Sequence, residues 1–145
     1  MLFRSVHQDQ GNYPEAVKLY EQSLDLAKDL GDKSGIARSL HQLGMVHQDQ
    51  GNYPEAVKLY EQSLDIKKDL GDKSGIASSL GQLGRIKEEN KDLEGALGDY
   101  LMALSIFEEL QSPYRDLAKK DIARLKETMG EEAFQSSLAK FGGSQ

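Results

Sequence analysis

The sequence predicts an all-α protein in which antiparallel helix pairs stack into an α-α superhelix with a C-terminal capping helix. Three observations lead to this class. A fifteen-residue phrase, GNYPEAVKLYEQSLD, occurs twice at a spacing of forty residues. Each copy carries apolar residues three and four positions apart, which is the spacing of one helical face. No segment alternates apolar and polar residues for long enough to argue for a strand.

The repeat extends well beyond that phrase. Sliding the chain by forty residues aligns 6–44 with 46–84, and 35 of these 39 pairs are identical. A third, diverged copy keeps the alanine and the tyrosine of the second helix as Ala96 and Tyr100. Such identity indicates a recent duplication or a consensus design, and the sequence leaves both open. The four exceptions are Leu26/Ile66, Ala27/Lys67, Arg38/Ser78 and His41/Gly81.

Each unit is expected to contain two helices. Over 36–50, apolar residues recur at helical spacing. A second helix is expected over 54–70, since the proline at its start suits a first turn, where a missing N–H costs nothing. Gly71 suits the left-handed position that ends a helix, and Asp72 or Ser74 can cap the next one.

Glycine lies inside the first helix of two units, as Gly44 and Gly84. Each costs about 1 kcal/mol relative to alanine, and close approach of the partner helix is the gain that would offset this cost. The expected packing positions are Leu40, Leu43, Gly44, Ala56, Tyr60 and Ser63, with the counterparts Leu80, Leu83, Gly84, Ala96, Tyr100 and Ala103.

These positions resemble the tetratricopeptide repeat (TPR) family over about residues 1–110. The family signature W-x2-L-G-x2-Y becomes Leu40-x2-Leu43-Gly44-x2-His47, followed by the small, aromatic and small residues of the second helix. The forty-residue period exceeds the usual 34 and is similar to long-repeat members such as kinesin light chains and bacterial and archaeal signalling proteins. The resemblance implies a TPR solenoid. Three departures are the residues at the tyrosine position, the missing closing proline, and Arg4 at the position of the glycines.

A single TPR-like domain is expected over 1–141. It would comprise a partial first repeat, a second unit, a third unit and capping helices, over 1–30, 31–70, 71–110 and 111–141, with a flexible tail at 142–145. In the capping segment the apolar spacing shifts, and a terminal helix with one polar face is what a repeat array needs at its end. The short start indicates either a fragment or a shortened first helix.

Composition limits the classes of function. The net charge is −6 without a basic stripe, so nucleic acid is not an expected partner. The chain has no cysteine, which excludes disulfides and thiolate zinc sites. No apolar run approaches the roughly 20 residues that cross a bilayer, and the start has no signal-peptide core, so a cytoplasmic location and no membrane contact are expected.

The sequence offers no catalytic constellation. No metalloprotease motif, phosphate loop or Ser/His/Asp arrangement is present, and GDKSG is explained as a turn between helices. We therefore expect no enzyme, no cofactor and no metal. His47 falls at a packing position, whereas His41 is expected on the opposite, exposed face.

The expected functional surface is the groove lined by the first helices, which form the concave side of stacked helix pairs. The resemblance implies that this groove binds a peptide or helical segment of a protein partner, and that Gln42 and Gln82 hold its backbone. Two of the four exceptions in the repeat lie on this face, as a non-repetitive partner would require, and free drift of exposed positions is the alternative explanation. The candidate contacts are Arg38, His41, Gln42, Met45, Gln48, Asp49, Ser78, Gln82, Arg85, Glu88 and Glu89.

A second hypothesis stays open at this point. A shortened first helix would leave apolar surface of the helix over 13–30 uncovered, and the faces of repeats are complementary to one another. The chain would then be a self-assembling structural unit, which forms a homo-oligomer through its N-terminal repeat edge by end-to-end stacking or domain swapping.

Overall fold

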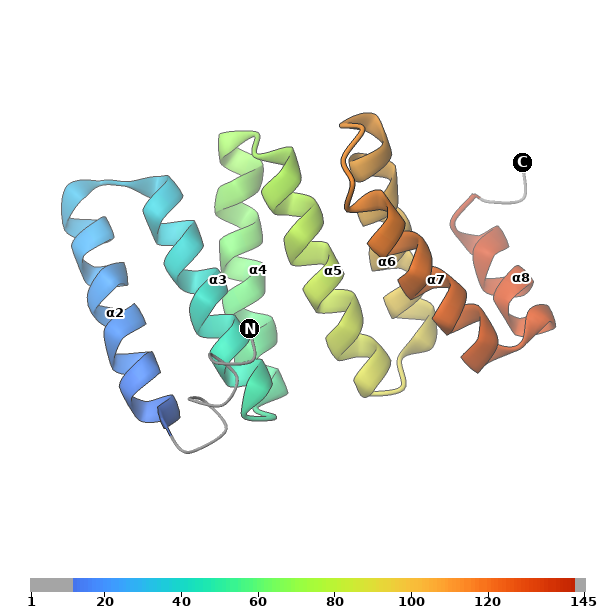
Figure 1. Ribbon diagram of the computed structural model, residues 1–145, viewed down its shortest axis with the longest axis horizontal. Coiled ribbons are helices and arrows are strands. Elements are labelled where there is room, and N and C mark those ends of the chain that lie inside the picture. The colour runs from blue at the N-terminus through green and yellow to red at the C-terminus, as the bar shows by residue number, and fades with distance from the viewer. Residues whose placement is uncertain (1–11, 143–145) are drawn as a thin grey trace. The chain divides into compact units, whose positions relative to one another are not determined.

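The computed structural model describes residues 12–142, and its regular elements over this range are α-helices (Figure 1). This confirms the all-α class of helical repeats. The start of the partial first repeat and the last three residues of the predicted tail lie outside the described residues. The helices are α2 (Tyr13–Leu30), α3 (Lys33–Asp49), α4 (Tyr53–Leu70), α5 (Lys73–Glu89), α6 (Leu93–Glu109), α7 (Arg115–Met129) and α8 (Glu131–Lys140).

The chain divides into two compact units, 1–72 and 73–145. In the first unit, α3 packs against both α2 and α4. In the second unit, α5 packs against α6, α6 packs against α7, and α8 contacts both α7 and α6 (Figure 1). The single domain expected over 1–141 stays a prediction.

Turn chemistry sets the helix ends. Gly31 and Gly71 end α2 and α4 in the left-handed conformation, at φ 68° and 70°, which glycine adopts without steric cost. The Asp32 carboxylate accepts a hydrogen bond of 2.9 Å from the backbone N–H of Gly35 and so caps α3. Asp92 caps α6 in the same way. A proline lies in the first turn of α2 and of α4, as the sequence predicts.

The predicted packing positions form the seam between the two helices of each pair. All twelve are buried, and Ala56, Tyr60, Ser63 and Ala96 are inaccessible to solvent. The Ser63 hydroxyl donates a hydrogen bond of 2.7 Å to the backbone carbonyl of Ala37, so this buried polar group is satisfied. The sequence prediction of the core is confirmed.

The helical glycines make room for a tyrosine ring. A Cβ atom at Gly44 would lie 2.9 Å from the ring of Tyr60, and one at Gly84 would lie 2.7 Å from the ring of Tyr100. Carbon atoms pack favourably at about 3.5–4.0 Å, so alanine at either position would overlap the ring. The close approach expected from the sequence is confirmed, and the contact is between glycine and tyrosine.

Helix α5 provides a matched pair of glycines for testing this seam. Gly81→Ala meets open space and should raise the free energy of unfolding by about 1 kcal/mol through helix propensity. Gly84→Ala gains the same propensity but is strained against Tyr100, and overpacking of this kind costs about 1–3 kcal/mol. In urea unfolding, the free energy of unfolding of the Gly81 variant should therefore exceed that of the Gly84 variant by about 1–3 kcal/mol. Equal stabilities would show that the ring moves aside freely.

Candidate functional site

A cleft of about 260 Å³ lies in the second unit, among α5, α6 and α7. Helix α5 contributes Ser78, Gln82 and Arg85, which are three of the predicted groove residues. Gly81 lies between them and has nothing within 4 Å of the position that a Cβ would take. The cleft therefore exists partly because this position of α5 carries no side chain.

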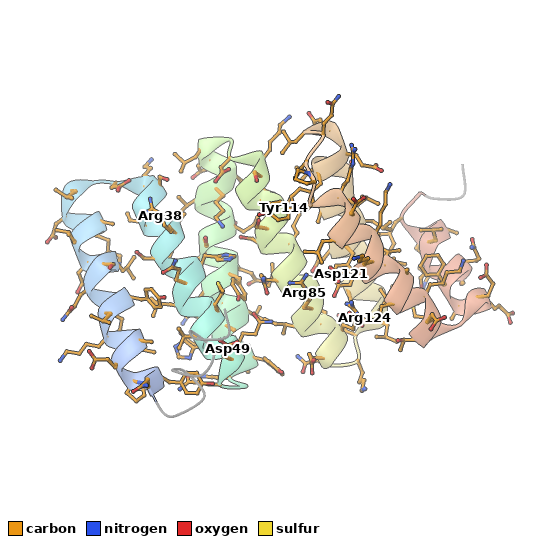
Figure 2. The ribbon with its side chains drawn as sticks, in the orientation of Figure 1. Arg38, Asp49, Arg85, Tyr114, Asp121 and Arg124 are labelled. Atoms are coloured by element: carbon orange, nitrogen blue, oxygen red, sulfur yellow. The ribbon has the colours of Figure 1, made fainter. Side chains whose placement is uncertain are left out.

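One end of the cleft is apolar. Phe107 of α6 and Tyr114, just before α7, form an aromatic pair with ring centroids 5.8 Å apart. Tyr114 and Leu117 are both exposed although they are large apolar side chains, and Figure 2 shows Tyr114 at the start of α7. Apolar side chains gathered beside a hollow are typical of contact surfaces.

The other end of the cleft carries an ion pair between helices. The Asp121 carboxylate of α7 accepts a hydrogen bond of 3.3 Å from Arg85 of α5 and one of 3.0 Å from Arg124. Figure 2 shows these three side chains close together. Two arginines compensate the burial of the Asp121 carboxylate. The Arg85 side chain is 34% exposed and that of Asp121 only 6%, so the cation is the more accessible member of the pair.

Glu88 belongs to the same network. Its carboxylate accepts a hydrogen bond of 2.7 Å from the Tyr100 hydroxyl. It also accepts hydrogen bonds of 3.0 and 2.8 Å from Nε and Nη2 of Arg124. The hydrogen bond from Arg124 holds the pKa of Glu88 below its usual value, while burial and the bond to Glu88 raise the pKa of Tyr100. Glu88 therefore joins the seam to the capping helix α7 and does not line the cleft.

The first unit differs at two equivalent positions. His41 and Lys67 occur where the second unit has Gly81 and Phe107. The His41 ring packs on Tyr60 with centroids 5.0 Å apart, and Lys67 Nζ lies 3.4 Å from His41 Nδ1. In this unit an imidazole ring thus lies against the tyrosine of the seam.

The structure corrects the expectation that His41 is exposed. His41 is half-buried because its ring lies against α4. Burial, followed by the charge of Lys67, lowers the pKa of His41 to about 4. Burial also lowers the pKa of Lys67, although the charge of Asp72 opposes this shift.

The remaining predicted contacts occupy different environments. Gln42 and Met45 are half-buried on α3, and Gln48 accepts a hydrogen bond of 2.6 Å from the Tyr60 hydroxyl. Arg38, Asp49 and Glu89 are exposed, and Figure 2 shows Arg38 and Asp49 near opposite ends of α3. Their role as partner contacts stays a prediction.

Sequence reasoning missed the walls that α6 and α7 contribute. Phe107, Tyr114, Leu117 and Asp121 line the cleft, but the sequence placed them in a packing helix and a cap. One signal was present. Asp121 is a charged residue on the same helical face as the apolar Ala118 and Leu125, where a lone aspartate requires a partner.

The structure also allows a search for other kinds of site. Between residues 12 and 142, no group of three or more histidine, aspartate or glutamate side chains is placed to hold a metal ion. Within the same range, none of the helices has the length and apolar character needed to span a membrane.

Comparison with known families supports the assignment that the seam suggests. Residues 5–69 match the family profile described as the tetratricopeptide repeat. Residues 5–69 thus carry the pattern of tetratricopeptide repeats. Repeats of this family generally serve as protein-interaction and scaffold modules. A comparison with curated protein sequences found no significant match.

Solved structures of other proteins resemble this chain over most of its length. BtubC (BKLC) from P. vanneervenii has a TM-score of 0.79 at 24% identity, and the match covers 90% of this chain and 55% of that one. A putative kinesin light chain of Podosopora anserina with nearly identical TPR-like repeats has a TM-score of 0.71 at 22% identity, covering 96% and 72%. A point variant of that kinesin light chain has a TM-score of 0.72 at 22% sequence identity, and the match covers 92% of this chain and 65% of that one. The chain thus spans little more than half of BtubC, and these likenesses show the fold.

The buried imidazole of His41 predicts a pH dependence of stability. Its folded pKa of about 4 lies below the ordinary histidine value of 6.5, so the folded state favours the neutral ring. Stability from this group is fully present above pH 6.5 and is lost as the pH falls toward 4, by at most about 3 kcal/mol. We expect His41→Gln to lose less stability than the parent between pH 7 and pH 4.5 in urea unfolding. An NMR titration that gives His41 a pKa of 6.5 or above in the folded protein would contradict this prediction.

Proposed function

We propose that this TPR chain is a protein–protein interaction module that binds a peptide or helical segment of its partner along the groove of its first helices. The cleft among α5, α6 and α7 is proposed as the anchoring point in the second unit. The observation that carries the proposal is the cleft itself, with Tyr114 and Leu117 exposed beside it.

The chemistry of the cleft indicates the kind of segment that fits. Phe107, Tyr114 and Leu117 offer apolar contact at one end, and Arg85 offers guanidinium donors at the other. The exposed groove residues carry both signs of charge, for example Arg38 and Asp49. An amphipathic segment with both signs of charge suits these groups better than a polyanion does.

The two units differ in what they leave open to such a segment. In the first unit the imidazole of His41 lies against Tyr60. In the second unit Gly81 leaves the corresponding space empty. We therefore expect the second unit to accept a bulky side chain of the partner. The predicted role of Gln82, which is half-buried at this cleft, is to hold the partner's backbone.

The test is to fill the cleft with the residue that the chain carries forty positions earlier. Peptides are first selected on the parent protein from a random display library, and their affinities are measured by calorimetry. Gly81→His should keep the fold, because histidine occurs at the equivalent position of α3, and it should weaken binding at least about tenfold, or 1.4 kcal/mol.

The control places the same residue elsewhere. Lys58→His, at an exposed position of α4, should leave the affinity unchanged. Selected peptides that bind the Gly81 variant as well as the parent would refute the cleft as anchor, and a library without binders would refute the module. Arg85→Ala is a poorer probe, because it also removes a partner of the buried Asp121.

The self-assembly hypothesis has one observation in its favour. Leu19 of α2 is 52% exposed, whereas its counterpart Leu59 on α4 is 8% exposed and packs in a cluster with Val17 and Tyr20 of α2. We propose as the alternative function that this N-terminal edge contacts another copy of the chain. Leu26→Gln combined with Leu30→Gln should then lower the mass measured by light scattering, and an unchanged mass would contradict it.

A further inference from the structure

Two helices of the first unit carry the same sequence in different surroundings. Residues 13–25 of α2 recur unchanged as residues 53–65 of α4. Helix α3 packs against both helices, and Figure 1 shows it between them. Because the side chains of the two segments are identical, a difference in their burial comes from the helices that surround them.

The side chains that are buried against α3 on α4 are open to solvent on α2. Leu59 of α4 is 8% exposed, whereas its counterpart Leu19 is 52% exposed. Ser63 is inaccessible to solvent, whereas its counterpart Ser23 is exposed. One helical turn further along the same face of α2, Leu26 is 60% exposed. This side of α2 therefore combines the chemistry of a buried helix face with the exposure of a surface.

Helix α3 shows which residues this face accepts when it is buried. Leu40 and Leu43 of α3 form one apolar cluster with Leu59 of α4. The serine hydroxyl of α4 donates a hydrogen bond of 2.7 Å to the backbone carbonyl of Ala37. Gly44 leaves room for the tyrosine ring of α4. The complementary helix therefore carries the pattern Ala-x2-Leu-x2-Leu-Gly, which runs from Ala37 to Gly44.

We infer that the exposed side of α2 binds a single amphipathic helix of another polypeptide that carries this pattern. The two leucines of the bound helix cover Leu19 and Leu26, whose removal from water drives the association. The glycine of the pattern lies against the ring of Tyr20. The Ser23 hydroxyl donates to a backbone carbonyl of the bound helix, as the equivalent Ser63 does to α3.

A folded second copy of the chain is a poor donor of such a helix. Within residues 12–142 the pattern occurs on α3 and α5, and these helices already pack against α4 and α6. The partner is therefore a helix that is not paired within its own chain. This occupant differs from the second copy of the alternative function, and the surface shares no residue with the cleft of the proposed function.

The test uses fluorescently labelled peptides copied from the chain's own helices. A peptide of residues 33–50 carries the pattern as it occurs in α3, and one of residues 73–90 carries it as it occurs in α5. Both should bind the parent protein when fluorescence anisotropy is measured at protein concentrations up to about 1 mM. A third peptide of equal length, residues 113–130, covers the amphipathic α7, lacks the pattern and should not bind.

Variants of α2 locate the binding surface. Leu19→Gln combined with Leu26→Gln changes two exposed side chains, so the fold should be retained, and it should weaken peptide binding at least about tenfold. Lys18→Gln combined with Asp25→Asn is the matched control, because the equivalent residues of α4 stay exposed beside α3. It should leave the affinity unchanged, and so should Gly81→His, which tests the cleft, so the two proposals fail separately. Circular dichroism melts should show that all variants are equally folded.

Four results would overturn the proposal. The first is that neither patterned peptide binds, and the second is that all three peptides bind equally, which would show unspecific apolar contact. The third is that binding survives the exchange of Leu19 and Leu26. The fourth is that the peptides bind only after residues 1–10 are removed, which would assign this side of α2 to the chain's own N-terminal residues. Self-association of a parent that binds neither peptide would favour a second copy as the occupant.

Discussion

The contact between a glycine and a tyrosine ring is the constraint on which the described helix pairs depend. Gly44 and Gly84 leave no room for even a methyl group beneath Tyr60 and Tyr100. This contact sets the distance between the two helices of a pair. The neighbouring positions, including Ala56 and Ser63, are small or apolar for the same reason, since little space remains between the helices.

The tyrosine hydroxyls then join the seam to polar groups at its edge. Tyr60 donates to Gln48 and Tyr100 donates to Glu88, twelve residues earlier in each unit. Because one acceptor is an amide and the other a carboxylate, the two units differ in electrostatics although their packing is alike. Only the carboxylate of Glu88 also binds Arg124, and so connects the seam of the second unit to α7.

A few substitutions on a shared scaffold thus give the units different surfaces. His41 lies against Tyr60 in the first unit, whereas Gly81 leaves a cleft beside Tyr100 in the second. Away from the seam, α6 carries glycines and a methionine where α4 carries charged and amide residues. None of these changes replaces the glycine or the tyrosine of the seam. A repeat protein can therefore acquire different contact surfaces without altering the packing that holds each pair together.

The sequence by itself determined the helices, their ends and the seam, because these depend on local rules and on spacing along one chain. The forty-residue period, Gly31 and Gly71 at helix ends, and the buried set around Tyr60 could all be read from it. Only the tertiary structure decided the surroundings of His41 and the walls of the cleft. The burial of His41 depends on α4, and the place of Asp121 depends on contacts with α5, thirty-six residues earlier. Periodicity shows which face a residue occupies, but the helix packed against that face sets its exposure, its partners and its pKa.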